Sequence, residues 1–449
     1  MKKIFQYIML AVVTIVMASC TSDIEETTAT IGKSNVQLVV GEFPAFGDSQ
    51  TRAIGTPDEG KTSWAEGDEL LLEIDNTSYG KQYATFTYNG KSWELTSGEL
   101  VYREGDPAYI PHVYYAPNYK WEAGKLVLKE GKDPGTDEYI EGNARISGNG
   151  EDINVSFAEA TRNYSRLRIA TMPNKPITVA ISKYTPAGSS DMKWDQNYAL
   201  TSDEKGNAYL YGTFENNSEV TVKYREATLA THTFLQKTEN AMSYALDATV
   251  ISVNSAEEIK SAIEQKVADG KTAIRLNLAP NAGTDEFMAI REAIKGAAPN
   301  DEGTIELTII GVETIPKEAF YKMLQLKSVR MSDVKEIKKY AFKECQYLTV
   351  VEAPSLNKLN SGAFNKCNLL SKLTFGPINY ADERNWPIFE YITPNIDLIL
   401  SDYQKEMIET DSYLYTANND RDYAGSDEHN SKNFLGREFR SITCRYKVK

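Results

Sequence analysis

Histidine and cysteine are scarce in this sequence, which argues against the commonest metal and nucleophile sites. The 449 residues include three histidines and four cysteines. His112, His232 and His429 are far apart and lack a metal-ligand spacing, and no two cysteines form a CxxC pair. GxSxG, P-loop, HExxH and GxGxxG motifs are missing as well. We therefore expect no catalytic residues, metal or cofactor, although carboxylates could still meet in space as an acid–base pair.

Positive charge is also in short supply. The chain has 49 lysines and arginines against 63 aspartates and glutamates, which gives a formal net charge of −14 at pH 7. Nucleic acid requires a basic surface, so we expect no nucleic-acid partner. Charged residues make up 25% and hydrophobic ones 41%, as in ordinary globular proteins, and the length predicts two or three domains.

A hydrophobic run long enough to span a bilayer is missing from the start of the chain. The ten apolar residues Ile8–Met17 follow a basic "MKK" and suit the core of a signal peptide instead. "MASC" then resembles a bacterial lipobox, with Met17 where leucine is usual. The resemblance implies a lipoprotein signal peptide at 1–19 and a diacylated Cys20 as the mature N-terminus. An ordinary secretory signal is the alternative.

The next segment, 20–33, is an acidic tether. Its "CTSDIEE" resembles the surface-export signal of Bacteroidetes lipoproteins. That resemblance implies an outer-membrane protein that is lipid-anchored and exposed on the cell surface, with the membrane contacted only through the anchor. A plain polar tether is the alternative.

Residues 34–253 are predicted to be all-β. Short alternating or apolar runs recur about every ten residues, and Gly, Asn, Asp and Pro separate them. Asn89-Gly90 lies between two such runs and predicts a hairpin with a type I′ turn. "TSWAEGDELLLEI", "YATFTYNGKSW", "VYYAPN" and "VSFAEATRNYSRLRIA" together resemble the fimbrillin family of pilin-like lipoproteins. The resemblance implies two transthyretin-like β-sandwiches, which we place at 34–172 and 173–253.

Arg52 is a candidate maturation site through this resemblance. In fimbrillins that polymerise, a protease cuts after an arginine in this region, and a neighbour's strand replaces the one removed. "NVQLVVGEF" precedes Arg52 here, so a removable strand lies in the right order. An exposed loop arginine without this role is the alternative.

Residues 254–449 have a different pattern. Ser255 and Glu258 form a capping box before an amphipathic helix that Gly270 ends, and "TDEFMAIREAIKG" predicts a second helix that ends at its glycine. These helices are expected to cap the repeats that follow.

A 22-residue repeat follows the helices. Phe320, Phe342 and Phe364 lie 22 residues apart, and five further apolar positions keep the same spacing. The pattern is leucine-rich-repeat grammar and resembles the BspA-like class, with core repeats at 305–376. We therefore expect an α/β solenoid in which stacked units share one core. The other aligned positions are Val312, Val334 and Leu356; Ile315, Ile337 and Leu359; Leu326, Leu348 and Leu370; Val329, Val351 and Leu373; Met331, Ala353 and Phe375.

Cys345 and Cys367 take the repeat position that Met323 fills one unit earlier. Buried free cysteine behaves as a small hydrophobe, so we expect these thiols to fill the core. Equivalent positions of stacked repeats lie close together, which leaves a Cys345–Cys367 disulfide open as the alternative.

Taken together, these patterns predict a non-enzymatic surface adhesin or a pilus-associated tip, anchor or accessory subunit. Its partners would be other pilus subunits or proteins on host or bacterial surfaces. The expected interaction face is the exposed side of the repeat strands, represented by Ser328, Arg330, Glu352, Lys372 and Thr374.

The alternative function is a surface glycan-binding lipoprotein that serves nutrient capture. It requires exposed aromatic rings on which sugars could stack. The candidate rings are Tyr114, Tyr115, Tyr119 and Trp121.

Overall fold

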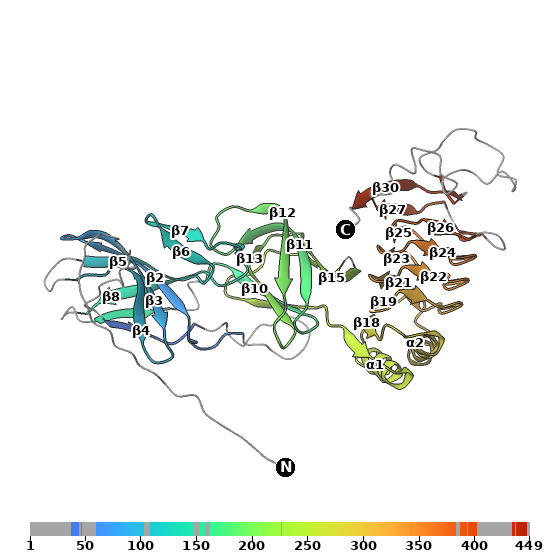
Figure 1. Ribbon diagram of the computed structural model, residues 1–449, viewed down its shortest axis with the longest axis horizontal. Coiled ribbons are helices and arrows are strands. Elements are labelled where there is room, and N and C mark those ends of the chain that lie inside the picture. The colour runs from blue at the N-terminus through green and yellow to red at the C-terminus, as the bar shows by residue number, and fades with distance from the viewer. Residues whose placement is uncertain are drawn as a thin grey trace, which may run out of the picture.

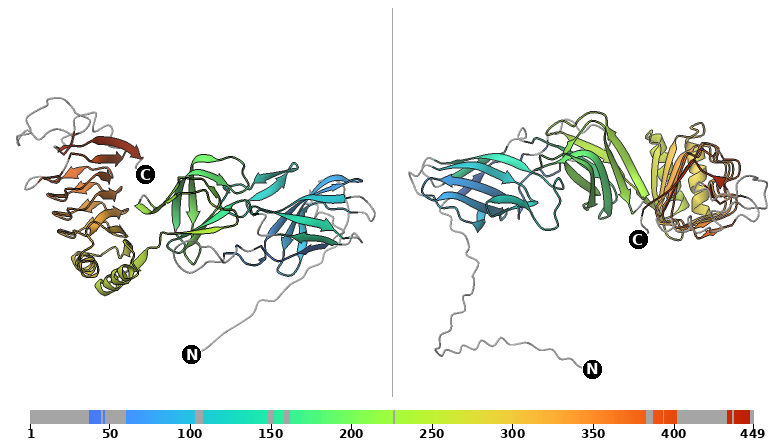
Figure 2. Two further views of the ribbon diagram at one scale, coloured as in Figure 1. Left: turned by 180° about the vertical axis from the view of Figure 1, so that it is seen from behind. Right: turned by 90° about the horizontal axis from the view of Figure 1, so that it is seen from above.

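The computed structural model describes residues 37–44, 46, 60–102, 108–147, 152–157, 162–225, 227–382, 387–392, 394–401, 433–435 and 437–446. Over these residues the protein is mostly β, with two helices and several sheets. Three parts follow one another along the long axis: the first sheet, the second sheet and the repeat region (Figures 1 and 2). Cys20 and Arg52 lie outside the described residues, so lipidation and maturation stay predictions.

The first sheet has seven strands, and its edge strand β1 pairs in parallel with β9. Strand β2 is buried on both faces, because a small hairpin, β6 and β7, covers the side opposite the main core. The hydrogen-bonded order is β1 (Gln37–Val40), β9 (Asp152–Ser156), β8 (Ile140–Ile146), β5 (Ala108–Tyr115), β2 (Glu69–Asn76), β3 (Gly80–Tyr88) and β4 (Trp93–Gly98), with the hairpin formed by β6 (Tyr119–Glu122) and β7 (Lys125–Leu128).

The predicted hairpin at Asn89-Gly90 joins β3 and β4, but its predicted turn type is wrong. A type I′ turn needs positive φ at both central residues, and only Gly90 has it, at 89°. The connection also spans four residues. The Asn89 side chain accepts hydrogen bonds from the backbone N–H groups of Lys91 and Ser92, at 2.9 and 2.8 Å, and so closes an Asx turn instead.

The second sheet also has seven strands. It already includes β10, which begins at Ser165 and so lies before the boundary predicted at 172/173. The ordered strands are β15 (Ala227–Phe234), β14 (Ser218–Tyr224), β11 (Pro176–Pro186), β13 (Asn207–Phe214), β10 (Ser165–Ala170) and β16 (Ser243–Asp247), with β12 (Lys193–Thr201) paired to β11.

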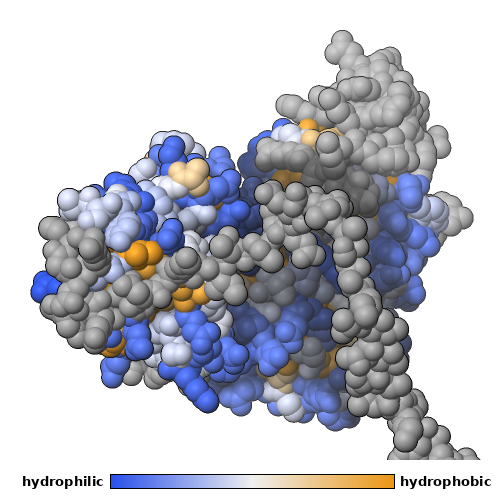
Figure 3. All heavy atoms as spheres, turned by 60° about the vertical axis from the view of Figure 1, so that its left-hand side comes forward, coloured by the Kyte–Doolittle hydropathy of each residue, from blue (hydrophilic) through white to orange (hydrophobic). Residues whose placement is uncertain are grey.

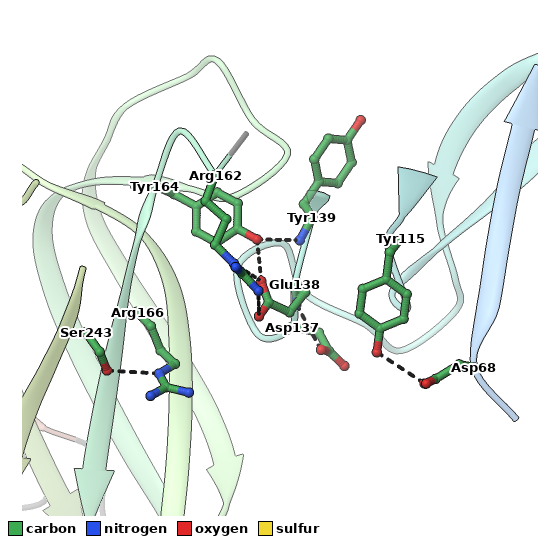
Figure 4. Close-up of polar contacts among 9 residues, drawn as sticks. All are labelled: Asp68, Tyr115, Asp137, Glu138, Tyr139, Arg162, Tyr164, Arg166 and Ser243. Atoms are coloured by element: carbon green, nitrogen blue, oxygen red, sulfur yellow. Dashed lines mark hydrogen bonds and ion pairs between the residues drawn. The ribbon is translucent and has the colours of Figure 1, made fainter. Parts of the chain in front are cut away.

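A buried polar network joins the first two sheets (Figure 4). Arg162 donates two hydrogen bonds to Glu138, at 3.0 and 3.2 Å, and the Tyr164 hydroxyl donates to the same carboxylate. Burial lowers the pKa of Arg162, but the charge of Glu138 more than offsets this and raises it. The ring of Phe46 stacks under Arg162, 4.0 Å from the guanidinium carbon, so the segment after β1 also packs into this junction.

Two helices begin the third part. In α1 (Ala256–Ala268), the Ser255 side chain accepts from the N–H of Glu258, and Gly270 follows the helix at a φ of 71°. The Glu258 carboxylate accepts from the N–H of Asn254 at 2.7 Å, one residue earlier than the predicted capping box requires. Helix α2 (Thr284–Ala297) continues through Gly296 and ends one residue beyond the predicted glycine stop.

The repeat region carries one long sheet and one short sheet, both parallel. Leu307 pairs with Val329, Val329 with Val351, and Val351 with Leu373, so neighbouring strands keep the predicted 22-residue register. The long sheet contains β17 (Ile251–Val253), β18 (Ala273–Leu278), β19 (Ile305–Ile310), β21 (Leu326–Met331), β23 (Val350–Ala353), β25 (Lys372–Phe375), β27 (Asp397–Ser401) and β30 (Ser441–Tyr446). The short sheet contains β20 (Thr314–Ile315), β22 (Glu336–Ile337), β24 (Lys358–Leu359) and β26 (Tyr380–Ala381), and a separate hairpin is formed by β28 (Asn433–Phe434) and β29 (Arg437–Glu438).

Phenylalanine rings stack through the middle of the repeats. The centroids of Phe320 and Phe342 are 5.1 Å apart and those of Phe342 and Phe364 are 5.4 Å apart, with nearly parallel planes. Phe389 extends the stack, and Phe287 of α2 closes its other end edge-on. The rings lie in one continuous core that runs from the helices to the last strands, as expected of units that share a core with their neighbours.

Candidate interaction site

Two rows of side chains point away from the core on the long parallel sheet. Strand residues alternate between the faces, so the positions between the buried ones form the outer face. In strand order, one row is Arg275, Thr308, Arg330, Glu352, Thr374 and Ile399, and the other is Ala273, Glu306, Ser328, Val350, Lys372 and Asp397.

The second sheet lies over the first rungs of this outer face. Strand β15 contacts β19 and β21, and Figure 1 shows it next to the edge of the repeat sheet. Thr308 and Ser328 are therefore only 2% and 3% exposed. Ser328 was expected on an open face, and that expectation is wrong, because another part of the same chain covers it.

A β-bulge prepares β15 for this contact. The pairing of β14 with β15 shifts after Val222, so that Leu229 has no partner across the strands. Its carbonyl accepts a hydrogen bond from the Arg275 side chain at 2.5 Å. Arg275 is 9% exposed and also lies 4.0 Å from the carboxylate of Asp247. The buried arginine thus ties the second sheet to the repeat sheet.

A second tie lies at the rim of the contact. The Arg225 guanidinium forms an ion pair with Asp333, which follows β21. The other oxygen of Asp333 accepts from the N–H of Gly311 at 2.9 Å, so this carboxylate is held in place by the repeat before it. Arg225 is well exposed, so the tie is expected to be weaker than that of Arg275.

Between the two sheets, beside these ties, the surfaces separate into a cleft of about 510 Å³. We call it the repeat cleft. One wall comes from β14 and β15 and the other from the outer face of the repeats. The lining residues are Thr221, Lys223, Thr228 and Thr231 on the first wall, and Arg330, Val350, Glu352, Pro354, Lys372, Thr374 and Ile399 on the second.

The cations of the cleft differ in how they are paired. Arg330 lies 3.4 Å from Glu306 and 3.6 Å from Glu352, so carboxylates of the neighbouring rungs hold it. Within the part of the chain that the structure describes, no ion pair is recorded for Lys223 or Lys372. These two ammonium groups, one on each wall, are available to a ligand.

Four of the five residues predicted for the interaction face, Arg330, Glu352, Lys372 and Thr374, line the repeat cleft. The 22-residue period was enough to find them. It gave no sign of the opposite wall, which is about a hundred residues earlier in the chain. The bulge at Leu229 has no sequence signature of its own, so neither the wall nor the ties could be predicted.

The aromatic side chains proposed for sugar stacking do not form an open platform. Tyr115 and Tyr119 are 3% and 9% exposed, and Tyr114 and Trp121 are half-buried against the small core under β2. Burial raises the pKa of Tyr114 to about 12, in line with its packed position. The arrangement argues against the glycan-binding alternative at these residues. On the face shown in Figure 3, apolar side chains are scattered among hydrophilic ones.

Two further kinds of site were sought in the described ranges. They contain no group of three His, Cys, Asp or Glu side chains placed to hold a metal ion. They also contain no helix that is long and apolar enough to cross a membrane.

Comparison with known proteins identifies the repeat region. Residues 310–408 match the BspA type leucine rich repeat region in six copies. The BspA-type match extends beyond the predicted repeats at 305–376, because the spacing between stacked rings changes from 22 to 25 residues between Phe364 and Phe389. A search at the fixed period could not follow that change.

Other comparisons give less. No curated protein matches the sequence. Among solved structures, the chain is similar to that of a "putative cell adhesion protein" from Bacteroides fragilis NCTC 9343, with 9% identity and a TM-score of 0.26 over 48% of this chain and 92% of that one. The fimbrillin resemblance of the first half has no counterpart in these matches and stays a prediction.

Proposed function

We propose that this protein is an outer-membrane surface lipoprotein that acts as a non-enzymatic adhesin or as a tip, anchor or accessory subunit of a pilus. In this proposal Cys20 carries the lipid anchor, and two fimbrillin-like sandwiches hold a leucine-rich-repeat solenoid away from the membrane. The BspA-type repeats supply the surface that contacts another protein.

The observation that carries the proposal is the open part of the outer repeat face. Val350, Lys372 and Ile399 belong to a flat parallel sheet whose neighbouring rungs are already covered by another sheet of the same chain. A surface that packs against protein in one half and lies open in the other is well suited to receive a second protein.

A role as a terminal or accessory subunit, and not as a repeating shaft subunit, follows from the order of the parts. A bulky repeat region follows the two β-rich parts at the far end of the molecule from β1 (Figure 1). If β1 is the strand that cleavage after Arg52 removes, a partner strand would enter at the end opposite the repeats. Long uniform filaments formed by the purified, protease-trimmed protein alone would overturn this part of the proposal.

The proposal is tested by removing the repeats from a displayed protein. The second sheet and the repeats have separate apolar cores, so a chain that ends after residue 253 keeps the cores of both preceding sheets. We expect cells that display the shortened chain to lose binding to host and bacterial surface proteins and to keep incorporation into filaments. Unchanged binding would contradict the adhesin role of the repeats.

A further inference from the structure

The repeat cleft is positive in a protein that is negative as a whole. Its walls carry Lys223, Arg330 and Lys372 against one acid, Glu352, whereas the chain has a formal net charge of −14. Positive groups that converge in a cleft favour an anionic ligand, because field lines concentrate between the two low-dielectric walls.

The two lysines are placed to act together. Lys223 is on β14 of the second sheet and Lys372 is on β25 of the repeats, so a ligand between them would contact both walls. The bulge beside Lys223 changes the direction of β15 at this point, and bulges commonly re-aim side chains beside binding sites. An anion bound here would neutralise two charges that no described acid pairs with.

The rest of the lining matches an extended peptide. Thr221, Thr231 and Thr374 offer hydroxyl groups that can both donate to and accept from backbone N–H and C=O groups. Val350 and Ile399 add an aliphatic patch beside the charges. None of the described lining residues is aromatic, so a sugar ring would find no flat apolar partner.

We propose that the repeat cleft binds an extended acidic peptide segment of a partner protein. Its carboxylates contact Lys223 and Lys372, and an aliphatic side chain packs against Val350 and Ile399. This inference rests on the proposed function, since it names the chemistry of the partner for the same surface.

The test measures peptide binding to the full soluble chain by fluorescence anisotropy. The probe is a fluorescein-labelled peptide that alternates glutamate and leucine, and its glutamine counterpart is the uncharged control. We expect only the glutamate peptide to bind, and its affinity to fall as salt is added. K223E and K372E should each weaken binding by about tenfold. K338E is the matched control, because it makes the same charge change at an exposed lysine that does not line the cleft.

The milder K223Q and K372Q variants guard against misfolding, and they should weaken binding in the same direction. Equal loss in K338E, or binding of the glutamine peptide as tightly as the glutamate one, would overturn the proposal. Heparin binding that depends on the two lysines, without peptide binding, would replace the peptide by an anionic polysaccharide and overturn it too.

The same variants separate this inference from the proposed function. If displayed K223E and K372E proteins adhere normally while the chain shortened after residue 253 does not, the adhesin role stands and the acidic-peptide site is wrong. If the purified chain binds the glutamate peptide through both lysines but the displayed protein adheres to no surface, the site stands and the adhesin role is wrong.

Discussion

Cys345 and Cys367 fill equivalent positions in the cores of consecutive repeats. Both thiols are free and fully buried, and each donates a hydrogen bond to a carbonyl of the preceding rung, that of Phe320 at 2.9 Å and that of Phe342 at 3.0 Å. Burial raises the pKa of Cys345 to about 12 and raises that of Cys367 as well. The structure therefore favours the core-filling interpretation over the disulfide.

Both thiols are therefore expected to be unreactive in the folded protein. At about pH 8 almost none of either group is thiolate, which is the reactive form. A thiol-specific dye should label Cys345 and Cys367 only after denaturant is added, as measured by mass spectrometry of the peptides. Cys444 is half-buried and serves as the internal comparison. Rapid labelling of Cys345 in the native protein, or a linked Cys345–Cys367 peptide, would contradict this interpretation.

At the level of the repeat unit, two turn positions adopt left-handed backbone conformations at the 22-residue period. Glu318, Tyr340 and Gly362 have φ angles of 57°, 60° and 65°. Lys322, Glu344 and Lys366 have φ angles of 57°, 62° and 59°. Positive φ at non-glycine residues is uncommon, so its recurrence shows that the packing of each unit imposes the conformation.

The single glycine in this series gives a prediction with an internal contrast. G362A should destabilise the repeats by about 1 kcal/mol, since alanine resists the left-handed conformation. G296A, in the exposed last turn of α2, should instead stabilise them by about 0.5–1 kcal/mol, because this glycine has open space around it. Urea unfolding of the full chain, followed by hydrogen exchange in the repeat strands, measures both. Equal effects of the two substitutions would show that the backbone conformation at Gly362 is not the cause.

Local patterns predicted the elements well, and the same patterns explain the failures. The 22-residue period placed the repeat strands in register, since identical spacing must stack identical side chains. It did not extend to Phe389, where the spacing is 25 residues. Asn89 closed its turn with a side chain rather than with its own positive φ, a choice that the dipeptide does not reveal. The repeat cleft depends on contacts between residues about a hundred positions apart, such as Lys223 with Lys372 across the walls, and no local pattern encodes these.

In the whole molecule, one buried arginine links the second sheet to the repeats and so sets the shape of the repeat cleft. Arg275 is held by the Leu229 carbonyl and by the charge of Asp247. Removing one partner of such a buried group leaves the other uncompensated, which is more costly than losing an exposed pair. We therefore regard Asp247 and Arg275, more than the exposed Arg225, as the groups that keep the cleft in its present form.

The docking of the two parts is expected to weaken in acid. Burial alone would raise the pKa of Asp247, but hydrogen bonds from Thr249 and the charge of Arg275 together lower it below its ordinary value of 3.8. The ionised carboxylate therefore stabilises the folded protein fully above about pH 3.8, and this contribution is lost as the pH falls through the lower pKa of the folded state.

Urea unfolding between about pH 6 and about pH 3 measures this contribution when the wild type is compared with D247N. The variant lacks the charge at every pH, so it should be less stable than the wild type at the upper end, and the difference should shrink in acid. D191N, at an exposed carboxylate of the second sheet, should follow the wild type throughout. A stability difference between D247N and the wild type that stays constant over this range would mean that Asp247 does not supply the acid sensitivity. The link through Arg275 would then rest on its hydrogen bond to Leu229 alone.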